Sequence, residues 1–214
     1  MIIDCHTHCL TAENAIVSCS PDAFFPVPGI LYSVGYHPWD VFGDCEWDML
    51  EAAARHPQVV AIGESGLDRL RGGDIECQER AFVKHVTLSE MLDKPLIIHE
   101  VKAVDSILRL RRELRPSQKW VRHGFRGNAN VAKMLTDKGF YLSFGEKFNA
   151  EAVKSVSLDR LLIETDDSKL PIGAVAEKIA TARGISVDDL LAVVVENTRN
   201  VLVSTVRERR KTQN

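Results

Sequence analysis

Short runs of consecutive apolar residues, rich in Val, Ile and Leu, recur along the chain, with longer mixed segments between most of them. Neighbouring side chains of a strand point to opposite faces, so a run that is apolar at consecutive positions indicates a strand covered on both sides, as in a parallel sheet. The pattern predicts eight strands: Met1–Cys5, Ala15–Ser18, Leu31–Gly35, Val59–Gly63, Pro95–Ile98, Lys119–Arg122, Phe140–Ser143 and Arg160–Ile163.

The segments between most of these strands place apolar residues near helical spacing, as Phe82, Val83 and Val86 do in residues 75–92. Helix stop signals follow several of them, such as Pro116 and Gly139. The predicted helices are Glu46–Arg55, Ile75–Leu92, Ala103–Leu114, Asn128–Lys138, Ala174–Arg183 and Val187–Val206.

Strands that alternate with helices through short connections predict an α/β fold, and eight of them predict a TIM (β/α)8 barrel. The first part of this barrel is expected to be trimmed. Residues 9–14 are too few for a full helix, and residues 20–30 contain three prolines. The chain has 214 residues, so we expect a single domain that spans 1–214.

The composition indicates which partners the protein can bind and in which cellular compartment it is expected. The formal net charge of −3 gives no overall field that attracts nucleic acid, so a polyanion would have to be bound locally by cations. The number of cysteines is five, which is odd, and no Cys-x-x-Cys pair occurs, so neither a disulfide framework nor a zinc ribbon is indicated. Without a secretory pattern or a long apolar run, we expect a cytoplasmic protein that does not bind membranes.

Imidazole and carboxylate side chains stand where five of the predicted strands end. The carboxyl ends of barrel strands form one face, and the active sites of such barrels lie there. His6 and His8 are two residues apart, so on an extended strand both rings point to the same side. These residue types bind divalent transition metals. The predicted ligands are His6, His8, Glu64, His99, His123 and Asp166.

Two of these residues are also the predicted catalytic residues. Glu64 lies between two glycines, and its carboxylate has two oxygens that can bridge two ions. Asp166 can bind an ion, orient the attacking water or take its proton. The predicted cofactor is one or two divalent ions, and a mixed His and carboxylate set accepts Zn, Mn, Mg, Fe or Ni.

Substrate contacts are predicted next to these ligands. His37 and Trp39 follow the third strand, and we expect His37 to touch the substrate, with a structural role as the alternative. His56 and His85 fall in helical segments, where a surface or structural role is expected.

Six motifs together resemble the TatD family of metal-dependent deoxyribonucleases, within the amidohydrolase-like superfamily. They are residues 4–8 (DCHTH), 35–39 (GYHPW), 61–68 (AIGESGLD), 95–99 (PLIIH), 123–125 (HGF) and 161–166 (LLIETD). The resemblance implies a TIM barrel, one or two divalent ions and phosphodiester hydrolysis, often by a 3′-end exonuclease on DNA. It further implies that His6, His8, Glu64 and Asp166 bind one ion, and that Glu64, His99 and His123 bind the other.

The family commonly has an arginine two residues after the fifth-strand histidine, where this chain has Val101. An arginine there would bind a phosphate through its bidentate fork. Arg69, Lys102 or Arg126 would have to replace it, and we include Arg69 and Arg126 among the predicted substrate-binding residues.

Three functions are compatible with these patterns. The first is a phosphodiesterase that acts on DNA. The second is a hydrolase on the same barrel that acts on a small phosphoester or a cyclic amide. The third is a non-catalytic metal-binding protein with a decayed site.

Overall fold

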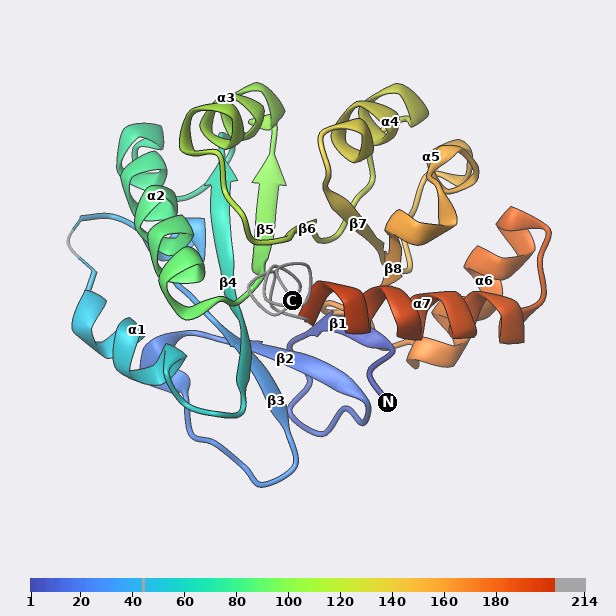
Figure 1. Ribbon diagram of the computed structural model, residues 1–214, viewed down its shortest axis with the longest axis horizontal. Helices are drawn as coiled ribbons and strands as arrows, with labels where there is room; N and C mark the ends of the chain where they lie inside the picture. Colours follow the sequence, from blue (N-terminus) through green and yellow to red (C-terminus); the bar gives the residue numbers. More distant parts are fainter. Residues whose placement is uncertain (44, 203–214) are drawn as a thin grey trace, which may run out of the picture. The chain divides into compact units, whose positions relative to one another are not determined.

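The computed structural model describes residues 1–43 and 45–202 of the chain (Figure 1). Its eight parallel strands follow one another in the order β1 to β8 in a closed barrel, which confirms the predicted TIM-type α/β fold. The strands are β1 (Asp4–Thr7), β2 (Ala15–Cys19), β3 (Leu31–Val34), β4 (Val59–Asp68), β5 (Leu96–Val101), β6 (Trp120–Arg122), β7 (Tyr141–Phe144) and β8 (Leu161–Ile163).

The described residues contain seven α-helices and three short 3-10 helices. The α-helices are α1 (Trp47–Ala54), α2 (Ile75–Leu92), α3 (Val104–Leu114), α4 (Ala129–Asp137), α5 (Ala150–Ser155), α6 (Ile172–Arg183) and α7 (Val187–Leu202). The 3-10 helices are η1 (Pro21–Ala23), η2 (Pro38–Asp40) and η3 (Leu158–Arg160). None of these helices is both long and apolar enough to cross a membrane. The cytoplasmic location stays a prediction.

The trimmed start of the barrel is confirmed. Within the described residues, the connection from β1 to β2 contains no helix, and the connection from β2 to β3 contains only the single turn of η1. Pro21 begins that turn, where a missing backbone N–H costs nothing.

Several predicted boundaries are wrong, and one helix was missed. β1 begins at Asp4 and ends at Thr7, so His6 lies inside the strand and not after it. β4 continues five residues past Gly63, so Glu64 also lies inside a strand. The six residues of α5 were not predicted, because a helix of fewer than two turns shows no periodicity. The end predicted for the last helix, at Val206, lies outside the described residues.

The chain divides into two compact units. Unit 1 consists of Met1–Val17 and Trp120–Val201, and unit 2 contains Ser18–Lys119. The expectation of a single domain stays a prediction, and each unit is described by itself.

Unit 1 contains β1, β6, β7, β8 and the helices α4 to α7. β8 pairs with β7 on one side and with β1 on the other, with Ile163 opposite both Phe144 and Asp4. Its core contains the fully buried side chains of Trp120, Phe140 and Phe144. The apolar runs that predicted these strands therefore form the core. His123 and Asp166 follow the ends of β6 and β8, whereas His6 lies inside β1.

Unit 2 contains β3, β4 and β5 with the helices α1, α2 and α3, and α2 packs against β4. Two glycines allow β4 to lie unusually close to β5. A Cβ at Gly63 would be 2.3 Å from the carbonyl oxygen of Ile97, and a Cβ at Gly66 would be 1.9 Å from that of His99. Both glycines also have positive φ angles, which other residues adopt at a cost. The glycines around Glu64 thus serve the approach of the neighbouring backbone.

Candidate metal centres

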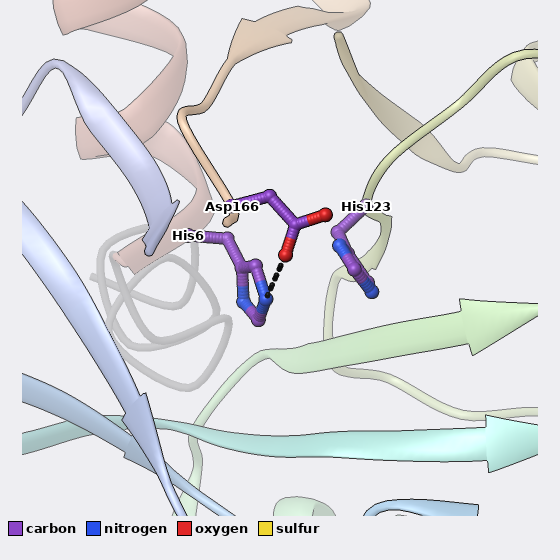
Figure 2. Close-up of side chains that lie close together, drawn as sticks. All are labelled: His6, His123 and Asp166. Carbon is purple, nitrogen blue, oxygen red and sulfur yellow. Dashed lines mark ion pairs between the residues drawn. The ribbon is translucent and has the colours of Figure 1, made fainter. Parts of the chain in front are cut away.

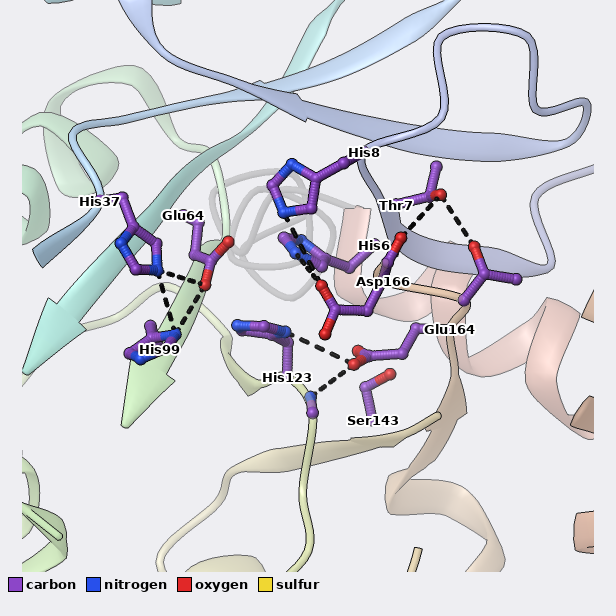
Figure 3. Close-up of polar contacts among 12 residues, drawn as sticks. His6, Thr7, His8, His37, Glu64, His99, His123, Ser143, Glu164 and Asp166 are labelled. Atoms are coloured by element: carbon purple, nitrogen blue, oxygen red, sulfur yellow. Dashed lines mark hydrogen bonds and ion pairs between the residues drawn. The ribbon is translucent and has the colours of Figure 1, made fainter. Parts of the chain in front are cut away.

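Four of the predicted ligands, His6, His8, His123 and Asp166, lie together in unit 1 and are called the His6 group (Figures 2 and 3). The Nε2 atoms of His6 and His8 are 3.8 Å and 3.7 Å from Oδ1 of Asp166. The rings of His6 and His123 have centroids 4.1 Å apart. These separations exceed hydrogen-bond length, but nitrogen and oxygen ligands about 2.1 Å from a shared ion lie roughly 3 to 4 Å apart. The His6 group therefore fits a divalent ion.

Backbone contacts between the ends of β1 and β8 bring Asp166 to the histidines. The amide of Asp166 donates to the carbonyl of His6 (3.0 Å), and the amide of His8 donates to the carbonyl of Asp166 (3.3 Å). Asp166 has a φ of 54°, a left-handed conformation that Asp tolerates better than most residues. This conformation turns the chain after β8, where the carboxylate of Asp166 lies near the rings of His6 and His8.

Asp4 ties the two strands together beneath the His6 group. Its Oδ2 accepts from the hydroxyl of Thr165 (2.6 Å), and its Oδ1 accepts from the Thr165 amide (3.0 Å). The Thr165 hydroxyl also lies 2.8 Å from that of Thr7. Burial raises the pKa of Asp4 to about 6, although the bonds from Thr165 counteract the rise. This contact fixes the residues immediately before Asp166.

Glu164 supports His123 and was not predicted as a functional residue. Its fully buried Oε1 accepts from the amide of Gly124 (2.6 Å) and lies 3.4 Å from Nδ1 of His123. Burial by itself would raise the pKa of Glu164, but the neighbouring His123 and His6 and a hydrogen bond from Ser143 together hold this pKa below its ordinary value. The available signal in the sequence was a charged residue directly after the apolar residues of β8.

A cavity of about 430 Å³ opens beside the His6 group within unit 1. Acidic residues line part of it, among them Asp166, and three cations line it as well: Arg126, Lys147 and Lys169. All three are exposed, and none of them forms an ion pair in residues 1–43 and 45–202. Arg126 was predicted to bind substrate, whereas the two lysines were not, because they stand on loops without a motif.

Glu64, His99 and His37 lie together in unit 2 and are called the Glu64 group (Figure 3). Oε1 of Glu64 is 2.8 Å from Nδ1 of His99 and 3.1 Å from Nε2 of His37, and these two nitrogens are 3.2 Å apart. Glu64 is buried on β4, and His99 stands on the adjacent strand β5. Three atoms that can bind metal thus converge on one point.

Asp68 and Trp39 stand directly behind His99. Oδ2 of Asp68 accepts from the indole Nε1 of Trp39 (2.6 Å) and lies 3.2 Å from Nε2 of His99. Burial alone would raise the pKa of Asp68, but the hydrogen bonds from Trp39, Leu70 and His99 hold it below its ordinary value. Asp68 belongs to the glycine-rich motif around Glu64, yet no spacing rule connected it to His99.

The structure also places the predicted substrate contacts and the helical histidine His85. His37 begins η2, and its Nδ1 accepts from the amide of Trp39 (3.2 Å). Arg69 is exposed and donates to the hydroxyl of Ser106 (3.0 Å). His85 is fully buried on α2, which agrees with the structural alternative. The assignment of His123 and Glu64 to one ion, and a bridge through Glu64, stay predictions.

Comparisons with known proteins found a family model and related sequences that match this chain. A family model described as TatD related DNase matches residues 26–203. The uncharacterized metal-dependent hydrolase YcfH of Escherichia coli K12 is 32% identical over 190 residues, which cover 78% of this chain and 72% of the relative. The uncharacterized metal-dependent hydrolase YabD of Bacillus subtilis is 30% identical over 196 residues, which cover 80% and 77%.

Two solved structures share the fold. YJJV, a TatD homolog of Escherichia coli K12, has a TM-score of 0.78 at 20% identity and covers 94% of this chain and 97% of its own. A TatD family hydrolase of Entamoeba histolytica has a TM-score of 0.74 at 17% identity, with the same coverage.

Proposed function

The chain belongs to the TatD related DNase family of metal-dependent hydrolases, and from this premise we propose that it cleaves phosphodiester bonds in DNA, one nucleotide at a time from an end. In this proposal the His6 group and the Glu64 group each bind a divalent ion. The sequence pointed to six of these seven residues as metal ligands by their type and position, whereas His37 of the Glu64 group was predicted to contact the substrate.

The observation that carries the proposal is the combination of charges in the cavity of unit 1. Asp166 of the His6 group and the cations Arg126, Lys147 and Lys169 line the same cavity, together with the carboxylates of Glu146, Glu164 and Asp167. A phosphodiester has a negative charge that the cations attract and oxygens that bind a divalent ion. Glu146, on the same wall, is already bound by Ser168 (2.7 Å) and Lys178 (3.9 Å), which reduces its repulsion of an anion. An uncharged amide would leave the three cations without a partner.

When bound, divalent ions supply Lewis-acid activation of water and of the phosphoryl group. The residues of the chain position the reactants. Asp166 presents Oδ1 to both His6 and His8, and we assign its other carboxylate oxygen as the acceptor of the proton from the attacking water. Arg126, Lys147 and Lys169 bind the phosphate. His37, Trp39 and Arg69 are retained as proposed substrate contacts in unit 2.

A second candidate substrate is a small phosphoester, because a cavity of about 430 Å³ has the volume of a typical small-molecule site. One assay separates the two. The purified protein, supplied with Mn²⁺, Mg²⁺ or Zn²⁺, is incubated with end-labelled single- and double-stranded DNA and with p-nitrophenyl phosphate. Release of mononucleotides supports the DNA proposal, and activity on the monoester alone favours the small substrate. If neither is hydrolysed with any metal, the proposed function is wrong.

A paired substitution tests the role of the cations. Lys147→Ala with Lys169→Ala should raise KM for DNA about tenfold and leave kcat nearly unchanged, since two exposed charge contacts contribute up to about 1 kcal/mol each. Lys133→Ala is the matched control, because Lys133 is exposed on α4 and pairs only with Asp137 among the described residues. An unchanged KM in the double variant would contradict phosphate binding by these lysines.

A further inference from the structure

Two loops of unit 1 carry the lysines of the cavity, and a hydrogen bond between the residues that precede these lysines connects the loops. Lys147 directly follows Glu146 in the loop after β7, and Lys169 directly follows Ser168 in the loop after β8. All four residues line the cavity. We propose that Glu146 and Ser168 are positioning residues: their hydrogen bond, called the clamp, holds the two loops so that both lysines face the same phosphate group. The inference rests on the proposed function in that a phosphate binds in this cavity.

The pairing of β7 with β8 brings the two loops side by side. Phe144, the last residue of β7, lies opposite Ile163, the last residue of β8. The amide of Glu164 donates to the carbonyl of Phe144 (3.2 Å), and a Cβ at Gly145 would be 3.6 Å from Cγ of Glu164. Beyond these residues the strands have ended, so the relative position of the loops depends on contacts between their side chains.

The clamp is a hydrogen bond from a hydroxyl group to a carboxylate. The Ser168 hydroxyl donates to Oε2 of Glu146 (2.7 Å) and accepts from the amide of Leu170 (3.1 Å). A hydroxyl has one proton to donate, and here that proton connects the two loops. The amide of Ser168 donates to the carbonyl of Thr165 (2.8 Å), which holds the turn that carries the hydroxyl. Oε1 of Glu146 lies 3.9 Å from Nζ of Lys178, so the carboxylate also has a partner on α6.

The clamp lowers the cost of binding one phosphate with two lysines. Both lysines are exposed, and each stands on a loop of its own. Bringing two separate loops to one anion costs conformational entropy, and the two positive charges repel each other. A hydrogen bond that already joins the loops removes much of the first cost before the phosphate binds. The negative charge of Glu146 offsets part of the repulsion between the lysines.

Glu146 has two opposite effects on a bound phosphate, and two substitutions separate them. Its charge repels the anion, whereas its hydrogen bond to Ser168 positions the lysines. Glu146→Gln removes the charge but keeps an oxygen that accepts from the Ser168 hydroxyl. Glu146→Ala removes both the charge and the acceptor. A residue that acted by its charge alone would make the two variants bind DNA equally well, whereas a positioning residue makes them differ.

The experiment measures the dissociation constant for a fluorescein-labelled single-stranded DNA by fluorescence anisotropy, with Mn²⁺ present and the salt concentration fixed. Phosphorothioate linkages in this DNA resist hydrolysis. We expect Ser168→Ala to bind about fivefold more weakly than wild type, which is less than the loss expected when both lysines are removed. We expect Glu146→Ala to bind about fivefold more weakly than Glu146→Gln for the same reason.

Ser186→Ala is the matched control. The Ser186 hydroxyl donates to a carboxylate oxygen of Asp189 (2.6 Å) and accepts from the amide of Asp189 (3.0 Å), which is the same combination of bonds as at Ser168. Ser186 lies between α6 and α7 and is not among the residues that line the cavity. Its substitution should leave the dissociation constant unchanged. Circular dichroism checks that each variant is folded.

A second comparison tests whether the clamp acts through the lysines. In a protein that carries Lys147→Ala and Lys169→Ala, the further change Ser168→Ala should alter the dissociation constant by less than about twofold, because no lysine is left to position. A merely structural role would weaken binding equally with and without the lysines. A fivefold loss that persists without them therefore overturns the inference. So does a dissociation constant for Glu146→Ala within about twofold of that for Glu146→Gln, even if Ser168→Ala does not fold.

The outcome is separable from that of the proposed function. A wild type that binds DNA with the expected differences between variants, but hydrolyses no phosphoester with any metal, would refute the proposed function and leave the clamp standing. Hydrolysis of DNA by a protein in which Glu146→Ala and Glu146→Gln bind equally well would do the reverse. A wild type that neither binds nor hydrolyses DNA would overturn both.

Discussion

His85 makes the stability of the protein depend on pH. The ring is fully buried on α2, its Nδ1 lies 2.8 Å from the carbonyl oxygen of Ala81, and its Nε2 accepts from the amide of Tyr36 (2.9 Å). The neutral ring, with its proton on Nδ1, satisfies both partners. Protonation at Nε2 would remove the acceptor of Tyr36 and place a charge in the core, and burial lowers the pKa of His85 from its ordinary 6.5 to about 4.

The size and the sign of the effect follow from this difference. The unfolded chain takes up the proton near pH 6.5 and the folded protein only near pH 4, so between these values the unfolded state binds more protons. The stabilisation that depends on a neutral His85 is complete above pH 6.5 and is lost as the pH falls towards 4. A difference of about 2.5 pH units, at about 1.4 kcal/mol each, amounts to about 3 kcal/mol.

The pH dependence of the free energy of unfolding of the wild type alone would conceal the contribution of His85. Burial raises the pKa of Asp4 from 3.8 to about 6, so its carboxyl group makes the folded protein less stable as the pH rises through the same interval. The two slopes oppose each other. The quantity to measure is therefore the difference in the free energy of unfolding between wild type and His85→Gln.

The assay is urea unfolding followed by circular dichroism at several values between about pH 7 and pH 4.5, with a chelator present throughout. We expect His85→Gln to be less stable than wild type at neutral pH, and this difference to shrink by 2 to 3 kcal/mol, roughly, towards pH 4.5. Thr87→Ala, an exposed and uncharged change on the same helix, should differ from wild type by a constant amount. A difference for His85→Gln that does not change with pH would refute the reasoning.

Two further substitutions test the support of the Glu64 group. Gln78→Leu leaves the amide of Asp68 without its acceptor and three carbonyl oxygens without a donor. It should therefore lower the free energy of unfolding, measured by urea titration, by about 2 to 4 kcal/mol. A loss below about 1 kcal/mol would mean that water replaces these hydrogen bonds. Gly66→Ala should lower the melting temperature strongly or prevent folding, because its methyl group would lie 1.9 Å from the carbonyl oxygen of His99. Gly173→Ala is the control, because Gly173 has open space around it and its substitution should change the melting temperature little. Equal melting temperatures of the two variants would contradict the close approach of β4 and β5.

The errors in the predicted elements have two causes. Gly63 was taken as the end of the fourth strand, because the apolar run stops there. In the structure it is required inside the strand, because β4 continues to pair with β5 as far as Asp68 opposite Val101. The short helix α5 was missed because Asn149 caps only six helical residues. Local patterns cannot show where pairing with a neighbouring strand extends an element.

The sequence alone determined the fold class and the chemistry of the candidate ligands. A run of consecutive apolar residues predicts a strand that is covered on both faces. A histidine or carboxylate that directly follows such a run is therefore expected at or near the end of that strand. The structure places the His6 group together in unit 1 and Glu64 beside His99 in unit 2, and the role of these residues as metal ligands stays a prediction.

Only the tertiary structure decided what each of these side chains does. His37 and His99 are the same residue type, yet Nδ1 of His37 accepts from the amide of Trp39, whereas the ring of His99 has the carboxylate of Glu64 on one side and that of Asp68 on the other. His85 is fixed in its neutral form by partners four and 49 residues away. The role of an imidazole depends on which group occupies the far side of its ring, and packing between distant segments supplies that group.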